Sequence, residues 1–138
     1  GLRVGFTSTG DMPDAEKAYR FYREGRIAVE HRVRSEVPDL WLCIEFNFMV
    51  VSGQSPLVDG EDMEADRGMY RAGTVEFRDE ERGAGLVMRS GSPWDVFVVP
   101  IECISQSEEG FEKTFQGWTV YWVRKLDGQI PEIMLEVL

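Results

Sequence analysis

Five arginines near the amino terminus have the clearest chemical potential in the sequence. They are Arg20, Arg23, Arg26, Arg32 and Arg34, and we call them the basic strip. A guanidinium donates hydrogen bonds in a planar fork that fits carboxylates and phosphates. The basic strip therefore predicts contact with an acidic protein surface, an anionic membrane surface or nucleic acid. The alternative is a solvated face that neighbouring glutamates balance.

Acidic residues gather in a long loop expected at residues 54–67 and in a turn after it. The candidates for contact with a basic partner are Asp59, Glu61, Asp62, Glu64, Asp66, Asp79, Glu80 and Glu81. Carboxylates at this density could hold Ca²⁺, which prefers oxygen ligands. The loop lacks the glycine and the distant glutamate of an EF-hand, so a solvated loop explains the same residues with fewer assumptions. We therefore expect no metal and no cofactor.

The side chains that could act as nucleophiles or zinc ligands are few. His31 is the only histidine, and it is expected on the apolar face of a strand without the partners of a catalytic triad. One histidine and the two separated cysteines, Cys43 and Cys103, do not make the usual zinc site. The cysteines are either free thiols or one bridge between sheets. These residues predict no catalytic centre.

Two further sets of residues leave a carbohydrate-related function open. Glu45, Asp95 and Glu102 lie within apolar strands, and two carboxylates that meet in a cleft could perform hydrolysis. Aromatic side chains can stack on sugars, and the candidates are Trp94, Trp118, Tyr121 and Trp122. The same aromatic residues, in the same alternation, also build the core between two sheets, which is the simpler interpretation.

One helix is expected, at about residues 12–24, and it would carry the first two arginines of the basic strip. Asp11 is a suitable N-cap, Pro13 suits the first turn, and Gly25 is a typical stop. Apolar and aromatic residues recur on one face at helical spacing. They are Met12, Ala15, Ala18, Tyr19 and Tyr22.

Most of the remaining chain alternates with the period of two that is typical of strands. Residues 26–34 and 40–51 show it clearly, and residues 118–126 and 130–138 are expected to form a hairpin across Asp127-Gly128. About eight or nine short strands predict a mainly β fold. We expect an antiparallel, jelly-roll-like β-sandwich or a partly open barrel, with the one N-terminal helix.

Composition limits the classes of protein to which the chain can belong. With 138 residues, of which 43% are hydrophobic, it fits a single β-rich domain over residues 1–138. Its net charge of −10 argues against nucleic-acid binding by the whole domain. The longest apolar stretch, residues 46–51, is interrupted by Asn47 and is too short to cross a membrane. The absence of a signal-peptide pattern favours an intracellular, cytoplasmic location, and the start at Gly1 favours a piece of a longer chain.

Three functional hypotheses follow. The leading one is a non-enzymatic structural or interaction domain that associates with itself through the basic strip and the acidic loops, as a capsid- or matrix-like scaffold by fold analogy alone. The second is an acidic inhibitor or immunity-type protein that masks a basic partner. The third is a carboxylate-dependent hydrolase or a carbohydrate-binding sandwich.

Overall fold

The computed structural model describes residues 2–6, 13–49, 55–64, 67–110 and 112–138. Within these ranges every regular element is a strand, and each pairing is antiparallel. The strands are β1 (Leu2–Phe6), β2 (Asp14–Phe21), β3 (Arg26–Arg34), β4 (Trp41–Met49), β5 (Leu57–Val58), β6 (Glu61–Asp62), β7 (Tyr70–Asp79), β8 (Ala84–Gln106), β9 (Glu112–Lys125) and β10 (Ile133–Val137). The described part of the chain therefore holds no helix of a length and hydropathy that would cross a membrane.

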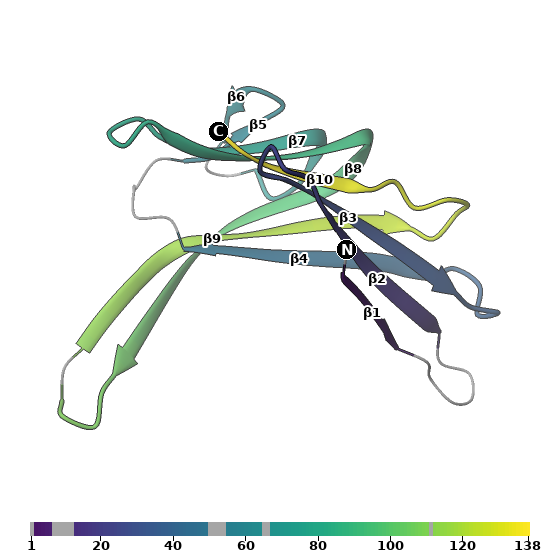
Figure 1. Cartoon of the computed structure of the whole chain (residues 1–138), viewed down its shortest axis with the longest axis horizontal. Coiled ribbons are helices and arrows are strands. Elements are labelled where there is room, and N and C mark those ends of the chain that lie inside the picture. Colours follow the sequence, from purple (N-terminus) through teal and green to yellow (C-terminus); the bar gives the residue numbers. More distant parts are fainter. Residues whose placement is uncertain (1, 7–12, 50–54, 65–66, 111) are drawn as a thin grey trace.

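The strands form one open sheet in the order β1-β2-β3-β10-β8-β7-β5-β6, with β9 joining β8 to β4. The first part of the 23-residue strand β8 pairs with β10, and its second part pairs with β9. The sheet thus divides into a front layer, which contains β1, β2, β3 and β10, and a back layer of β4, β9 and the second part of β8. Figure 1 shows β4 and β9 passing behind β2 and β3.

The hydrophobic core lies between the two layers. Trp94 of β8 and Trp122 of β9 are fully buried, and their rings meet edge to face at 6.1 Å between centroids. The Trp94 indole Nε1 donates to Ser90 Oγ at 2.9 Å, so this ring is anchored as well as packed. Phe48 of β4 contacts Phe77 of β7 at 5.2 Å between centroids, which joins the back layer to the strand that pairs with the first part of β8.

The prediction of a helix at residues 12–24 is wrong. Residues 14–21 form β2, which pairs with β3 from Asp14↔Arg34 to Phe21↔Ile27 and with β1 on its other side. Gly25, expected to end a helix, instead adopts a φ of 76° in the tight turn between β2 and β3. Pairing on both sides outweighs the modest helix propensity of this segment. The expected cap, Asp11, and Met12 lie outside the described residues.

The mainly antiparallel β fold is confirmed, but its connections differ from those expected. The segment Asp127-Gly128 does not close a hairpin, because β9 pairs with β4 and β8 while β10 pairs with β3 and β8. Gly128, at a φ of 78°, instead lies where the chain passes from the back layer to the front. In the described ranges, one open, bent sheet of ten strands takes the place of the expected sandwich or barrel.

Candidate functional site

A groove of about 630 Å³ lies beside the second half of β3. β10 pairs with β3 from Arg26 to Val29, so beyond Val29 the chain between β9 and β10 forms the opposite wall. Strand alternation places Glu30, Arg32 and Arg34 on one face of β3. Arg20 of β2 lies next to them because its backbone partner is Ala28. The opposite wall is formed by residues 128–132, among them Gln129 and Glu132.

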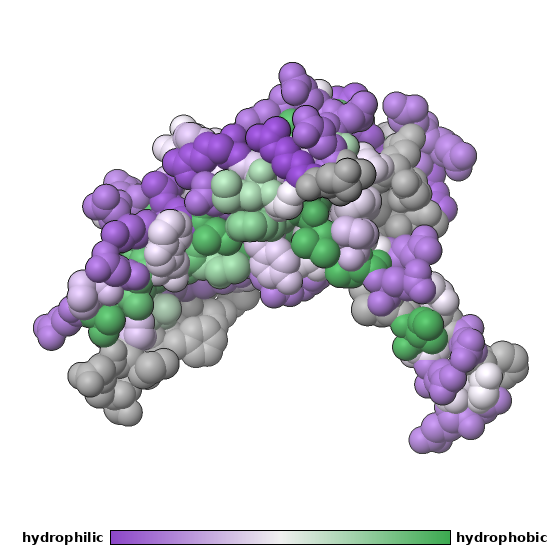
Figure 2. All heavy atoms as spheres, turned by 180° about the vertical axis from the view of Figure 1, so that it is seen from behind, coloured by the Kyte–Doolittle hydropathy of each residue, from purple (hydrophilic) through white to green (hydrophobic). Residues whose placement is uncertain are grey.

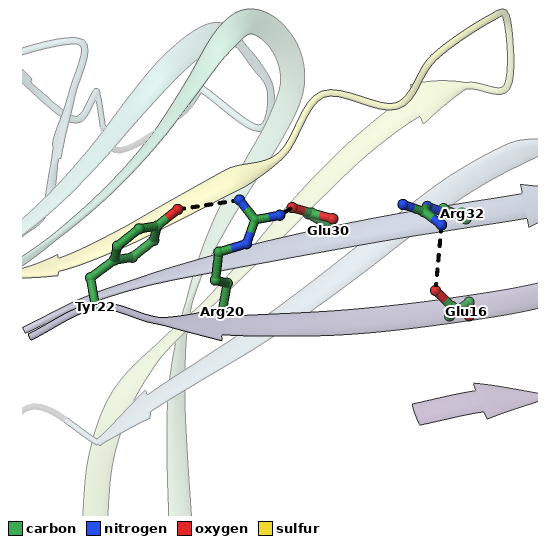
Figure 3. Close-up of polar contacts among 5 residues, drawn as sticks. All are labelled: Glu16, Arg20, Tyr22, Glu30 and Arg32. Carbon is green, nitrogen blue, oxygen red and sulfur yellow. Dashed lines mark hydrogen bonds and ion pairs between the residues drawn. The ribbon is translucent and has the colours of Figure 1, made fainter. Parts of the chain in front are cut away.

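Charged side chains in and beside this groove are arranged as donor–acceptor pairs (Figure 3). Arg20 Nη2 forms an ion pair with Glu30 Oε1, and Arg20 Nη1 donates to the Tyr22 hydroxyl at 3.3 Å. Arg32 Nη1 lies 3.9 Å from Glu16 Oε1. The hydrogen bond with Tyr22 and the charge of Glu30 raise the pKa of Arg20, so this guanidinium remains a donor. The groove therefore offers hydrogen-bond donors and acceptors side by side.

The structure brings together part of the basic strip. Arg20, Arg32 and Arg34 line the groove, whereas Arg23 lies in the turn after β2. Arg26 lies at the start of β3, where its guanidinium is 5.3 Å from the centre of the Tyr22 ring and 3.5 Å from Glu24 Oε2. Three members of the basic strip thus have glutamate partners, as expected for a face whose charges are balanced.

The acidic loop is organised around the backbone of β7. Asp59 Oδ1 accepts hydrogen bonds from the amides of Gly73 at 3.0 Å and Thr74 at 2.9 Å, where the register between β7 and β8 shifts. The exposed residues Glu61 and Asp62 form β6, and the backbone of Glu64 bonds to the Tyr70 hydroxyl. Asp66 lies outside the described residues. In the part of the chain that the structure covers, no three His, Cys, Asp or Glu residues could together hold a metal ion.

The second acidic turn connects β7 to β8. Asp79 Oδ1 accepts from the backbone amide of Arg82 at 3.1 Å, and Arg82 Nη1 lies 3.6 Å from Asp79 Oδ2. Glu80 and Glu81 are exposed. This turn and the loop around Asp59 do not line the groove, so the acidic candidates and the groove arginines do not form one site.

The three carboxylates considered for hydrolysis are dispersed. Glu45 accepts a hydrogen bond from Asn47 Nδ2 at 2.7 Å, and Asp95 pairs with Arg71 at 3.2 Å. Their backbones lie on opposite sides of β9, about 9.5 Å apart across the strands and offset by two residues. Glu102 points to the other face of β8, seven residues further on. These residues therefore form no catalytic pair.

The cysteines lie too far apart for a bridge, and three of the four aromatic candidates belong to the core or pack against it. Cys43 is an exposed free thiol, and burial and the charge of Glu45 raise its pKa. Its partner on β9 is Val123, whereas Cys103 pairs with Phe115, about 26 Å further along that strand, which rules out a bridge. Trp94 and Trp122 are core residues, and Trp118 packs against the core.

Comparisons with known proteins identify the kind of domain that this fold represents. A family model described as "Alpha-amylase/4-alpha-glucanotransferase, C-terminal" matches residues 3–133. Among solved structures, the 4-alpha-glucanotransferase from Thermococcus litoralis is similar in fold, with a TM-score of 0.61 and 20% sequence identity. The match covers 96% of this chain and 19% of that chain, so the chain spans about a fifth of that enzyme. A search of curated proteins gave no match.

These findings overturn the leading hypothesis. A self-associating structural scaffold of capsid or matrix type is wrong, because the family model places nearly the whole chain in a carbohydrate-active group. The match favours the third hypothesis, which linked the chain to carbohydrates, over both other readings. No short motif could have revealed this, since the resemblance is spread over the whole length of the domain at low identity. The chain belongs to the family of C-terminal domains of alpha-amylases and 4-alpha-glucanotransferases.

Proposed function

We propose that this chain is a non-catalytic C-terminal domain of an enzyme that acts on α-glucans, and that its groove binds part of the glucan chain. The observation that carries the proposal is the family match over residues 3–133. The dispersal of Glu45, Asp95 and Glu102 supports a non-catalytic role, because glycoside hydrolysis commonly needs two carboxyl groups on either side of one bond.

The groove has a chemistry that suits a neutral sugar. Each sugar hydroxyl both donates and accepts a hydrogen bond, a guanidinium only donates, and a carboxylate only accepts. Neighbouring hydroxyls can therefore bridge the pair formed by Arg20 and Glu30, while Gln129 offers an amide from the opposite wall. The volume of about 630 Å³ lies within the range of small-molecule sites.

Glucan binding can be tested by calorimetry with maltoheptaose and the variant Arg32→Ala. We expect the variant to bind about tenfold more weakly, a loss of about 1.4 kcal/mol, because one set of donors leaves the groove. Arg82→Ala is a matched control. The Arg82 side chain is 61% exposed against 64% for Arg32, and each lies within 4 Å of a carboxylate, but Arg82 is outside the groove. If both variants bind maltoheptaose equally well, the groove is not the glucan-binding site.

The non-catalytic role has its own test. The 138-residue chain, incubated with maltoheptaose, should neither shorten nor lengthen the oligosaccharide, whereas the full-length enzyme that contains it should. The products are separated by chromatography over several hours. Transfer or hydrolysis by the chain alone would show that it carries a catalytic centre that its dispersed carboxylates do not indicate.

A further inference from the structure

An apolar stripe crosses the outer face of the back layer, between polar residues of the same strands. Strand alternation turns the side chains of Ile44, Val96 and Trp122 into the core and the intervening side chains outward. The register aligns those outward side chains in neighbouring rows across β4, β9 and β8. Six of them form what we call the back face: Trp41, Cys43, Phe97, Val99, Tyr121 and Val123.

The back face is open in the described structure. Trp41 is 59% exposed and Val99 is 43% exposed, and the other aromatic and aliphatic members are partly exposed. Seen from behind, an apolar band crosses the middle of the molecule with hydrophilic side chains around it (Figure 2). An antiparallel sheet whose inner face already forms the core normally presents polar residues on its other face. A contiguous apolar patch on such a face typically marks a contact surface.

Polar residues of the same strands lie at the border of this patch, and they contact one another. Arg71 pairs with Asp95 at 3.2 Å, Asn47 donates to Glu45 at 2.7 Å, and Lys125 pairs with Asp39 at 2.6 Å. Glu45 is the strand partner of Tyr121 and Asp95 that of Val123, so the apolar side chains form a stripe with charged neighbours on both sides. An apolar centre with a polar rim is the usual composition of a protein–protein contact.

We propose that the back face packs against the rest of the same polypeptide, the catalytic part of the enzyme. The inference rests on the proposed function, which makes this chain one domain of a longer protein. The length of the relative supports this occupant, because four-fifths of that chain lies outside the match. A protein surface with apolar side chains can cover the back face without leaving its own polar groups unpaired.

Two other occupants fit the back face less well. A glucan can stack on the rings of Phe97 and Tyr121, but Val99 and Val123 offer its many hydroxyls no donors or acceptors, so those hydroxyls would lose hydrogen bonds with water. A second copy would bring together two molecules that each carry a net charge of −10, which repel one another. Both occupants are outcomes that the test below distinguishes.

Cys43 is a natural probe because it lies within the back face and is exposed in this structure. The full-length enzyme and the 138-residue chain are treated with N-ethylmaleimide, and mass spectrometry follows modification of the Cys43 peptide. We expect labelling in the full-length enzyme to be on the order of tenfold slower, because a docked surface must open before the thiol reacts. Equal rates would overturn the docking.

A second measurement stays within the full-length enzyme. Val99→Asp introduces a charge into the centre of the back face and should speed labelling of Cys43 about fivefold or more by loosening the contact. Ile104→Asp is the matched control, because Ile104 is an exposed β-branched residue of the same strand that points to its other face. Continued protection of Cys43 in Val99→Asp, with a native fluorescence spectrum, would also overturn the docking.

The remaining outcomes separate the occupants and the two proposals. Protection that appears only with maltoheptaose would show a glucan on the back face, and protection lost on dilution would show a second copy. Either result overturns the proposal. A natural gene product of only 15.8 kDa would contradict the proposed function itself. Fast labelling of Cys43 inside a longer enzyme would contradict the docking and leave the proposed function standing.

Discussion

His31 has surroundings that differ strongly from water. It lies on β3 beside Lys17 of β2, since the two are backbone partners. Burial, and then the positive charge of Lys17, lower the pKa of the imidazole from 6.5 to about 4. Its Nδ1 is buried and has no hydrogen-bond partner within the described ranges. His31 is thus held neutral at physiological pH, which fits a packing role.

The neutral state of His31 makes folding stability depend on pH. Above about pH 6.5 the imidazole is neutral in both states, whereas between pH 6.5 and about 4 only the unfolded chain binds the proton. Stability should therefore fall as the pH drops through this window. After discounting for solvent screening, we expect wild type to lose about 1–2 kcal/mol more than His31→Gln between pH 7 and 4.5 in urea unfolding.

Nuclear magnetic resonance gives a direct check of the same prediction. The chain has one histidine, so a single imidazole signal should titrate, with a midpoint near 4. A midpoint near 6.5 would contradict the buried, neutral state. So would identical pH profiles of unfolding for the wild type and His31→Gln.

At the scale of elements, β2 shows where the sequence could not predict the fold. An aspartate, a proline and a glycine at the ends of residues 12–24 are as typical of turns as of helix ends. What decides between the two is pairing with the neighbouring strands β1 and β3, which the pattern of residues 12–24 taken alone does not show. By contrast, the long runs that became β3, β4 and β9 were predictable, because their alternation is a local property.

The groove was only half predictable for the same reason. Arg32 and Arg34 could be grouped from the sequence because β3 shows its alternation directly, whereas Arg20 was expected on a helix and lies beside them on β2. The opposite wall, residues 128–132, could not be foreseen, because Asp127-Gly128 resembles a hairpin turn but carries the chain between layers. The back face was hidden because several outward residues of β4, β8 and β9 are apolar, as the inward residues are, so the pattern does not say which side is covered.

The turn at Asp59 shows how one side chain fixes an irregular element. Its carboxylate accepts from two successive amides at the bulge of β7, and its backbone adopts a φ of 50°. Asp59→Ala should destabilise the fold by about 1–2 kcal/mol, because two charge-assisted hydrogen bonds are lost and alanine tolerates this backbone conformation poorly. Thermal and urea unfolding measure the effect.

Two variants sharpen that test. Asp59→Asn keeps a side-chain oxygen acceptor and a residue type that accepts a positive φ, so it should lose less stability than Asp59→Ala. Asp62→Ala removes an exposed carboxylate from β6 and should change stability by less than about 0.5 kcal/mol. If Asp62→Ala and Asp59→Ala were equally stable, the carboxylate of Asp59 would not anchor the bulge.

At the scale of the whole molecule, β8 decides how the two layers behave. Its 23 residues pair with β7 and β10 in the first part and with β9 in the second, so neither layer is complete without it. The largest buried side chains, Trp94 and Trp122, contact each other from β8 and β9 within the core between the layers. Loss of the back layer would expose both rings and leave half of β8 unpaired.

We therefore expect the domain to unfold in one cooperative transition. Tryptophan fluorescence, which reports the core, and far-ultraviolet circular dichroism, which reports the strands, should give coincident urea curves. Trp122→Ala should shift both curves together by about 3–5 kcal/mol, because it removes the ring that fills the space between the layers. Two outcomes would contradict this: separate midpoints for the two probes, or a fluorescence change that precedes the loss of strand signal. Either would mean that the two layers unfold independently although they share β8.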